Sequence, residues 1–164
     1  MIPNMPRLPQ LLLGLLLSAW LLVGLPSAAA EAAAIPLSSM EGSPAVAGAI
    51  EEYLASMPHD YHAIRSIPAL KRILESPESL LIDVRTVSEY KSGHIPGAVN
   101  IPLDVLGTHV AEIPPDQKVV LYCSTGYRSA MGVMALQLEG RHLAMGFPPS
   151  IDGWKAAGEP VLAS

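Results

Sequence analysis

The sequence predicts an α/β domain in which a central, mostly parallel, five-stranded sheet carries helices on both faces. Two observations favour this class. Stretches typical of strands alternate with stretches typical of helices from residue 61 onward. In addition, the stretches "LLIDV" and "KVVLY" are apolar almost throughout, which is the pattern of strands buried on both faces of a sheet.

The first predicted element is an N-terminal helix over residues 44–60. Ser43 is suited to cap it, and Pro44 suits its first turn. Its apolar residues recur at helical spacing and form one face: Val46, Ile50, Tyr53, Leu54 and Met57. We expect this face to dock on the domain that follows and not to bind a partner protein.

The domain itself is predicted to span residues 61–164. Its five expected strands are, in order, "YHAI", "SLLIDVR", "GAVNIPL", "KVVLYC" and "HLAMG". Helices are expected between and after them, in "SIPALKRILES", "TVSEYKSG", "DVLGTHVAEI", "RSAMGVMALQLEG" and "SIDGWKAAG". Gly140 is suited to end the fourth of these helices.

The first 30 residues have the three parts of a secretory signal peptide. Arg7 supplies the basic start, "LLLGLLLSAWLLVGL" the apolar run, and "PSAAAEAAA" an exit of small residues. The alternative is an uncleaved membrane anchor, but Pro26 ends the run short of the about 20 apolar residues that a spanning helix needs. We therefore expect an exported, periplasmic protein with residues 31–43 as a flexible tether and no stable membrane insertion after cleavage.

Composition limits the function further. Removal of the leader takes away Arg7 and makes the formal net charge one unit more negative than −5. An acidic domain without a basic stripe has no footprint for nucleic acid. The chain has a single cysteine, so it cannot form an internal disulfide or complete a cysteine-based zinc site. The histidines show no metal-ligand spacing, and we expect no metal and no cofactor.

The single cysteine, Cys123, stands where a predicted strand ends and a predicted helix begins. Ligands of α/β sheets bind at this end of the strands, and the N-terminus of a helix favours a thiolate. Gly126 allows a tight loop, and Arg128 adds a permanent charge for an anionic substrate. From spacing alone, however, a buried cysteine that packs as a small apolar side chain is the more common case.

Three ordered motifs resemble the single-domain rhodaneses, a family of sulfurtransferases. "LLIDVRTVSEYKSGHIPGAVNIPL" is similar to the family's first signature, "VVLYCSTGYRSA" to its active loop and "WKAAGEPV" to its closing segment. The similarity runs from Ile67 to Val161. It implies a rhodanese-like domain in which Cys123 accepts a sulfane sulfur from a small anionic donor such as thiosulfate. The resulting persulfide would pass the sulfur to cyanide or to a thiol, including a protein thiol.

The resemblance also implies roles for neighbouring residues. The cradle around the sulfur, which would bind the substrate, would consist of Ser124, Thr125, Gly126, Tyr127 and Arg128. Arg85 would help to recruit the anion. Structural residues near the site would be Asp83, Glu89 and His94. The Cys-x4-Arg loop is one residue shorter than the Cys-x5-Arg loop of phosphatases with a similar fold, which favours sulfur transfer over phosphate chemistry.

One stretch departs from the family pattern. A pair of glycines usually precedes the last helix in the order Gly-Gly-x-x-x-Trp, whereas Pro149 and Ser150 precede Trp154 here. Proline fixes φ and removes a hydrogen-bond donor, so a loop of different shape is expected beside the site. This departure keeps a second hypothesis open, a sulfur carrier or binding module with little turnover of its own.

Overall fold

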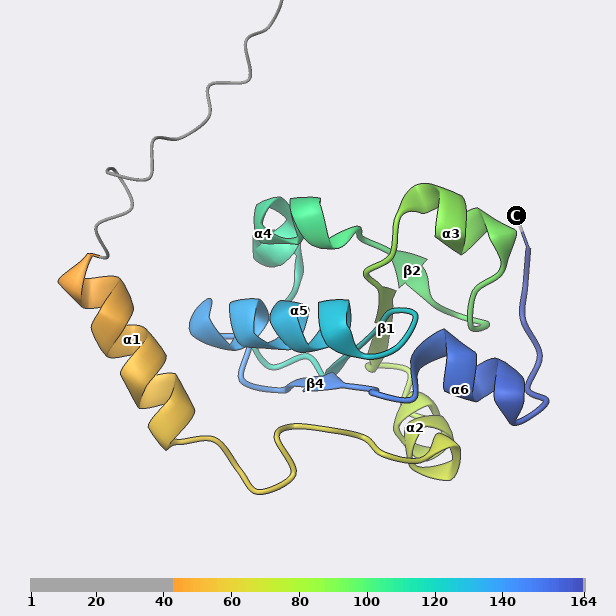
Figure 1. Cartoon of the computed structure of the whole chain (residues 1–164), viewed down its shortest axis with the longest axis horizontal. Helices are drawn as coiled ribbons and strands as arrows, with labels where there is room; N and C mark the ends of the chain where they lie inside the picture. The colour runs from red at the N-terminus through yellow and green to blue at the C-terminus, as the bar shows by residue number, and fades with distance from the viewer. Residues whose placement is uncertain (1–42, 164) are drawn as a thin grey trace, which may run out of the picture. The chain divides into compact units, whose positions relative to one another are not determined.

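The computed structural model describes residues 43–163. The predicted signal peptide, and the predicted tether except for Ser43, lie outside these residues (Figure 1). Within the described part of the chain, no helix combines the length and the apolar character that a membrane crossing requires.

The sheet has four parallel strands in the order β2-β1-β3-β4. Their bounds are Leu80–Asp83 for β1, Val99–Asn100 for β2, Val119–Tyr122 for β3 and Ala144–Gly146 for β4. Strands β1 and β3 occupy the centre, with Ile82 opposite Leu121, and every residue of β3 is buried. The parallel sheet with buried central strands is therefore as the apolar stretches predict.

The prediction of a fifth strand in "YHAI" is wrong. Only Ala63 pairs with the sheet, through a single parallel bridge to Gly146 at the edge of β4. Tyr61 and His62 have φ values of 56° and 55°, and this left-handed backbone cannot continue as a strand. The Asp60 carboxylate accepts a hydrogen bond from the His62 N–H at 3.1 Å, so a local turn takes the place of the extended segment.

Helices cover both faces of the sheet, as expected (Figure 1). One face packs against α5 (Tyr127–Leu138) and α4 (Leu106–His109), and the other against α2 (Ile67–Leu74) and α6 (Ser150–Ala156). The helix predicted in "DVLGTHVAEI" is divided into η2 (Leu103–Val105), α4 and η3 (Val110–Glu112). Short α3 (Val87–Ser92) follows β1.

The N-terminal helix α1 (Pro44–Ala55) is docked only in part. It contacts α5, and Ile50, Tyr53 and the following Met57 are half-buried. No residue of α1 is fully buried, and Leu54 remains 57% exposed. The predicted docking face therefore covers part of the domain and leaves apolar surface beside α5.

Candidate active site

The chain between β3 and α5 closes around the sulfur of Cys123. The Gly126 N–H donates a hydrogen bond to Sγ at 3.1 Å. Gly126 has a φ of 101°, and a Cβ there would lie 3.1 Å from the carbonyl oxygen of Pro148. Both the left-handed backbone and this close approach require glycine, so the loop owes its shape to Gly126.

Two opposing effects act on the thiol of Cys123, which is only 1% exposed. Burial raises the pKa of Cys123, because it disfavours the charged form. Hydrogen bonds from the backbone N–H groups of Ser129, Gly126 and Thr125 and from the Ser150 hydroxyl outweigh burial, and the pKa of Cys123 is lowered overall. A lowered pKa increases the fraction of thiolate, the nucleophilic form of cysteine.

The guanidinium of Arg128 is engaged by a carboxylate instead of standing open for an anion. It donates to both oxygens of Glu89 at 2.7 Å and to the Ser124 hydroxyl at 2.9 Å. The hydrogen bonds from Arg128, supported by those from Thr86, hold the pKa of Glu89 well below its usual range. In this arrangement Arg128 fixes the shape of the loop, and its charge is compensated by Glu89.

Glu89 has a second function in the local structure. Its carboxylate accepts a hydrogen bond from the Thr86 N–H at 3.1 Å, while the Thr86 hydroxyl accepts one from the Glu89 N–H at 3.3 Å. This reciprocal pair is a capping box that starts α3. One carboxylate therefore ties the beginning of α3 to the cysteine loop.

The predicted residues Asp83 and Arg85 form a separate, buried ion pair. Their closest oxygen and nitrogen atoms lie 2.6 Å apart, and the side chains are 0% and 4% exposed. Arg85 also donates to the carbonyl of Gly93 at 2.8 Å and lies over the ring of Tyr122. The guanidinium of Arg85 is thus buried, and it joins the end of β1 to the segment that follows α3.

The remaining predicted residues have clear positions. His94 is buried, its ring stacks on Tyr90 with centroids 3.8 Å apart, and its backbone pairs with Leu162. Thr125 is exposed, and Tyr127 is 83% exposed. In the described part of the chain, no three His, Cys, Asp or Glu residues are grouped to hold a metal ion.

Ser150 is a site residue whose contacts the sequence analysis missed. Its hydroxyl accepts a hydrogen bond from the Cys123 N–H at 3.2 Å. Its one proton has two acceptors within reach, the Phe147 carbonyl at 2.9 Å and Sγ at 3.9 Å. The residue is fully buried and has a φ of 52°. The glycine that the family usually has at this position could have indicated a left-handed backbone there, because glycine readily takes a positive φ. The departure therefore changes the immediate surroundings of the sulfur.

Comparisons with known proteins agree with this fold. The profile of the rhodanese-like domain matches residues 66–157. A sulfurtransferase from Allochromatium vinosum is 32% identical over 93 residues, which cover 57% of this chain and 87% of that protein. A putative sulfur carrier protein from Bacillus subtilis is 32% identical over 90 residues, which cover 54% of this chain and 49% of that protein.

Solved structures of similar fold support the assignment. A rhodanese-related protein from Thermoplasma volcanium is 28% identical with a TM-score of 0.55, and the match covers 62% of this chain and all of that one. A human single-domain sulfurtransferase is 25% identical with a TM-score of 0.52, and the match covers 55% of this chain and 92% of that one. The chain belongs to the rhodanese family.

Proposed function

We propose that this protein is a sulfurtransferase that carries a sulfane sulfur as a persulfide on Cys123. Relatedness to the sulfurtransferase of Allochromatium vinosum supports sulfur transfer in general. The observation that carries the finer proposal is the hydrogen bond from the Gly126 N–H to Sγ, within a loop that lowers the pKa of the thiol. A thiolate held by inward N–H groups is the nucleophile that a persulfide mechanism needs.

The proposed reaction has two steps. The Cys123 thiolate attacks the outer sulfur of thiosulfate, the S–S bond of thiosulfate breaks, and sulfite leaves with the electron pair. A nucleophile such as cyanide or a thiolate then attacks the outer sulfur of the persulfide, and Cys123 leaves as a thiolate. The N–H groups that stabilise the first thiolate also stabilise this leaving group.

A second candidate function is a sulfur carrier that loads sulfur but turns over slowly alone. Two observations favour it: the similarity to the putative sulfur carrier protein of Bacillus subtilis, and the buried Ser150 where the family usually has glycine. A carrier would deliver its persulfide to the thiol of one particular protein.

Intact mass after incubation with thiosulfate, followed by cyanide, tests both candidates. The sulfurtransferase gains one sulfur atom, loses it to cyanide and produces thiocyanate over many turnovers. A carrier gains the sulfur but produces little thiocyanate. The Cys123→Ser variant is the matched control, and it gains no sulfur under either hypothesis. Failure of the wild-type chain to gain sulfur would contradict both.

We also propose that the chain is exported. The basic start, apolar run and small-residue exit of residues 1–30 support this proposal. Expression of the whole chain in a bacterium, followed by fractionation and N-terminal sequencing, tests it. We expect a periplasmic product that begins after Ala30. A product that keeps Met1 and remains with the membranes would favour the anchor instead.

A further inference from the structure

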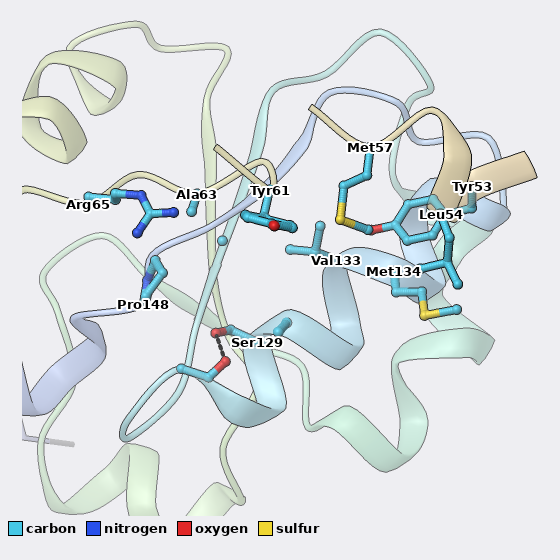
Figure 2. Close-up of a pocket in the computed structure, with 13 residues that line it drawn as sticks. Tyr53, Leu54, Met57, Tyr61, Ala63, Arg65, Ser129, Val133, Met134 and Pro148 are labelled. Carbon is cyan, nitrogen blue, oxygen red and sulfur yellow. Dashed lines mark hydrogen bonds between the residues drawn. The ribbon is translucent and has the colours of Figure 1, made fainter. Parts of the chain in front are cut away.

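A cavity of about 340 Å³ lies between α1 and α5, next to the segment that joins α1 to the sheet (Figure 2). Much of its wall is apolar: Leu54 comes from α1, Met57 from the residues just after it, and Val133 and Met134 from α5. A volume of this size falls in the range of about 300–1,000 Å³ that is typical of sites for small organic molecules. Cys123 does not line the cavity, which is therefore a space separate from the reactive sulfur.

The cavity has one charged end and one apolar end. Figure 2 shows Arg65 and Pro148 at one end, Leu54 and Met134 at the other, and Tyr61 between them. Small-molecule sites of this kind hold the body of a ligand by apolar contacts and fix its orientation with a few polar groups. A ligand that matches this cavity therefore has an apolar body and a charged group at one end.

Arg65 determines the sign of the charge that this end can accept. Among the described residues, it is the only charged one that lines the cavity, and no aspartate or glutamate lines it. Arg85 and Arg128 are each paired with a carboxylate, whereas Arg65 forms no salt bridge within residues 43–163. A guanidinium offers two parallel donors that match the oxygens of a carboxylate. The charged end of the cavity therefore favours an anion.

We propose that this cavity is a second binding site, distinct from the cysteine loop, for a small organic carboxylate with an unbranched apolar body. The carboxylate group lies beside Arg65, and the apolar body extends along α5 toward Leu54 and Met134. The ligand takes no part in sulfur transfer, so this inference does not depend on the proposed function.

The position of the cavity links the ligand to the N-terminal helix. Helix α1 contacts α5, but none of its residues is fully buried and Leu54 is 57% exposed. A ligand that fills the space between the two helices covers apolar surface on both of them, which the docked helix alone leaves open. Binding and docking then stabilise each other, because the ligand binds the docked form better than a form with α1 released.

Spectra of the purified chain with ¹³C-labelled methionine methyl groups locate the ligand directly. Met57 and Met134 line the cavity, whereas Met131 lies on α5 outside it and is 64% exposed. Titration with heptanoate should shift the signals of Met57 and Met134 and leave Met131 in place, and Cys123→Ser should behave in the same way. No shift at Met57 and Met134 would overturn the proposal. A shift of both signals on dilution of the ligand-free protein would also overturn it, because a second copy of the chain would then occupy the cavity.

Related ligands test the two ends of the cavity. Heptanoate should bind about tenfold or more tightly than butanoate, because each additional methylene adds up to about fourfold when it is buried. Heptylamine has a similar body with the opposite charge, and it should bind about fivefold more weakly than heptanoate, as for an exposed charge contact. Equal affinities within either pair of ligands would contradict the assignment of that end.

Matched variants test the individual residues. Arg65→Gln should abolish the preference for heptanoate over heptylamine, whereas Arg72→Gln, at an exposed position of α2 outside the cavity, should keep it. Leu54→Glu should weaken heptanoate binding about tenfold or more, because a charge replaces part of the apolar wall. Its control is Val46→Glu, on the same helix at a position that is 54% exposed and does not line the cavity. Effects of equal size in the variants and their controls would overturn the assignment.

Hydrogen exchange of the α1 amides tests the link to docking. At a heptanoate concentration about ten times its Kd, exchange in α1 should slow about tenfold, since release of the helix then requires loss of the ligand. In Leu54→Glu the same concentration should slow exchange in α1 much less. If exchange in wild-type α1 is unchanged while the Met134 signal shifts, the ligand contacts α5 alone and the link to α1 is wrong.

Discussion

The two sides of the cysteine loop are held in different ways. Toward α3, hydrogen bonds between side chains hold the loop. Arg128 donates to both carboxylate oxygens of Glu89 and to the Ser124 hydroxyl. Toward Pro148, the backbone of Gly126 packs directly on a backbone carbonyl, and an apolar cavity opens beyond it. One side is polar and charge-compensated, whereas the other depends on close packing and holds open space.

The groups that fix the shape of the loop therefore differ from the groups that stabilise a charged sulfur. A guanidinium that is already paired with a carboxylate has little net charge to offer a donor, so the polar side mainly fixes the loop. Attraction for the charged sulfur then falls to the N–H groups around Cys123 and to the first turn of α5.

The largest expected effect comes from the packed side, with Gly126→Ala. A Cβ would contact the Pro148 carbonyl, and the φ of 101° strains any residue with a side chain. We expect the loop to shift and the N–H contact to Sγ to lengthen, with a fall of about a hundredfold in persulfide formation, as when one oxyanion donor is lost. Stopped-flow measurement of persulfide formation checks this.

Gly48→Ala is the matched control for Gly126→Ala. Gly48 lies within α1, and nothing lies within 4 Å of the position that its Cβ would take. Alanine should therefore leave persulfide formation unchanged and favour the helix by about 1 kcal/mol locally. A wild-type rate in Gly126→Ala would show that close packing against Pro148 does not hold the loop.

On the polar side of the loop, the sequence predicts the local features but not the long-range ion pair. The residues close to Cys123 in sequence predict two features of the site. Gly126 predicts a tight loop, and Arg128 predicts a positive charge beside it. The pairing of Arg128 with Glu89 joins residues far apart in sequence, and it depends on how α3 packs beside the loop. The resemblance implies only that Glu89 is a structural residue near the site, and its partner cannot be named without the fold.

The packed side was harder still to predict. The apolar composition of the buried strands predicts them correctly. Four of the five expected strands are present in residues 43–163. The segment "YHAI" has strand-like composition, but the turn formed with Asp60 overrides it. Nor does composition predict the cavity, because that depends on α1 docking only in part on α5.

An intermediate effect is expected from Glu89→Gln, which breaks the ion pair of the polar side but keeps an amide that can serve the capping box. The pKa of Glu89 is lowered in the folded protein, so its pairing stabilises the fold above the unfolded pKa of about 4.3. That contribution is lost as pH falls below about 4.3 and through the lower folded pKa. Because both side chains are about one-third exposed, we expect a cost of about 1 kcal/mol at pH 7.

Urea unfolding of wild type and Glu89→Gln at a series of pH values measures this contribution. The difference between the two proteins should be largest near neutrality and shrink as the medium becomes more acidic than pH 4.3 or so. Glu78→Gln, at an exposed position without a salt bridge within residues 43–163, should match the wild type throughout. A difference that is independent of pH would assign the effect to the capping box and not to the charge pair.

The smallest effect is expected at Ser150. Two variants at this position separate the effect of the hydroxyl from the effect of the strained backbone. Ser150→Ala removes the hydroxyl and keeps a side chain at a φ of 52°, whereas Ser150→Gly removes both. The hydroxyl helps to lower the pKa of Cys123, so both variants should raise that pKa and move the pH midpoint of persulfide formation upward equally. Glycine should be the more stable of the two by about 1 kcal/mol, because it adopts the left-handed conformation without strain. A midpoint that moves in only one variant would show that backbone shape, and not the hydroxyl, sets the ionisation of the sulfur.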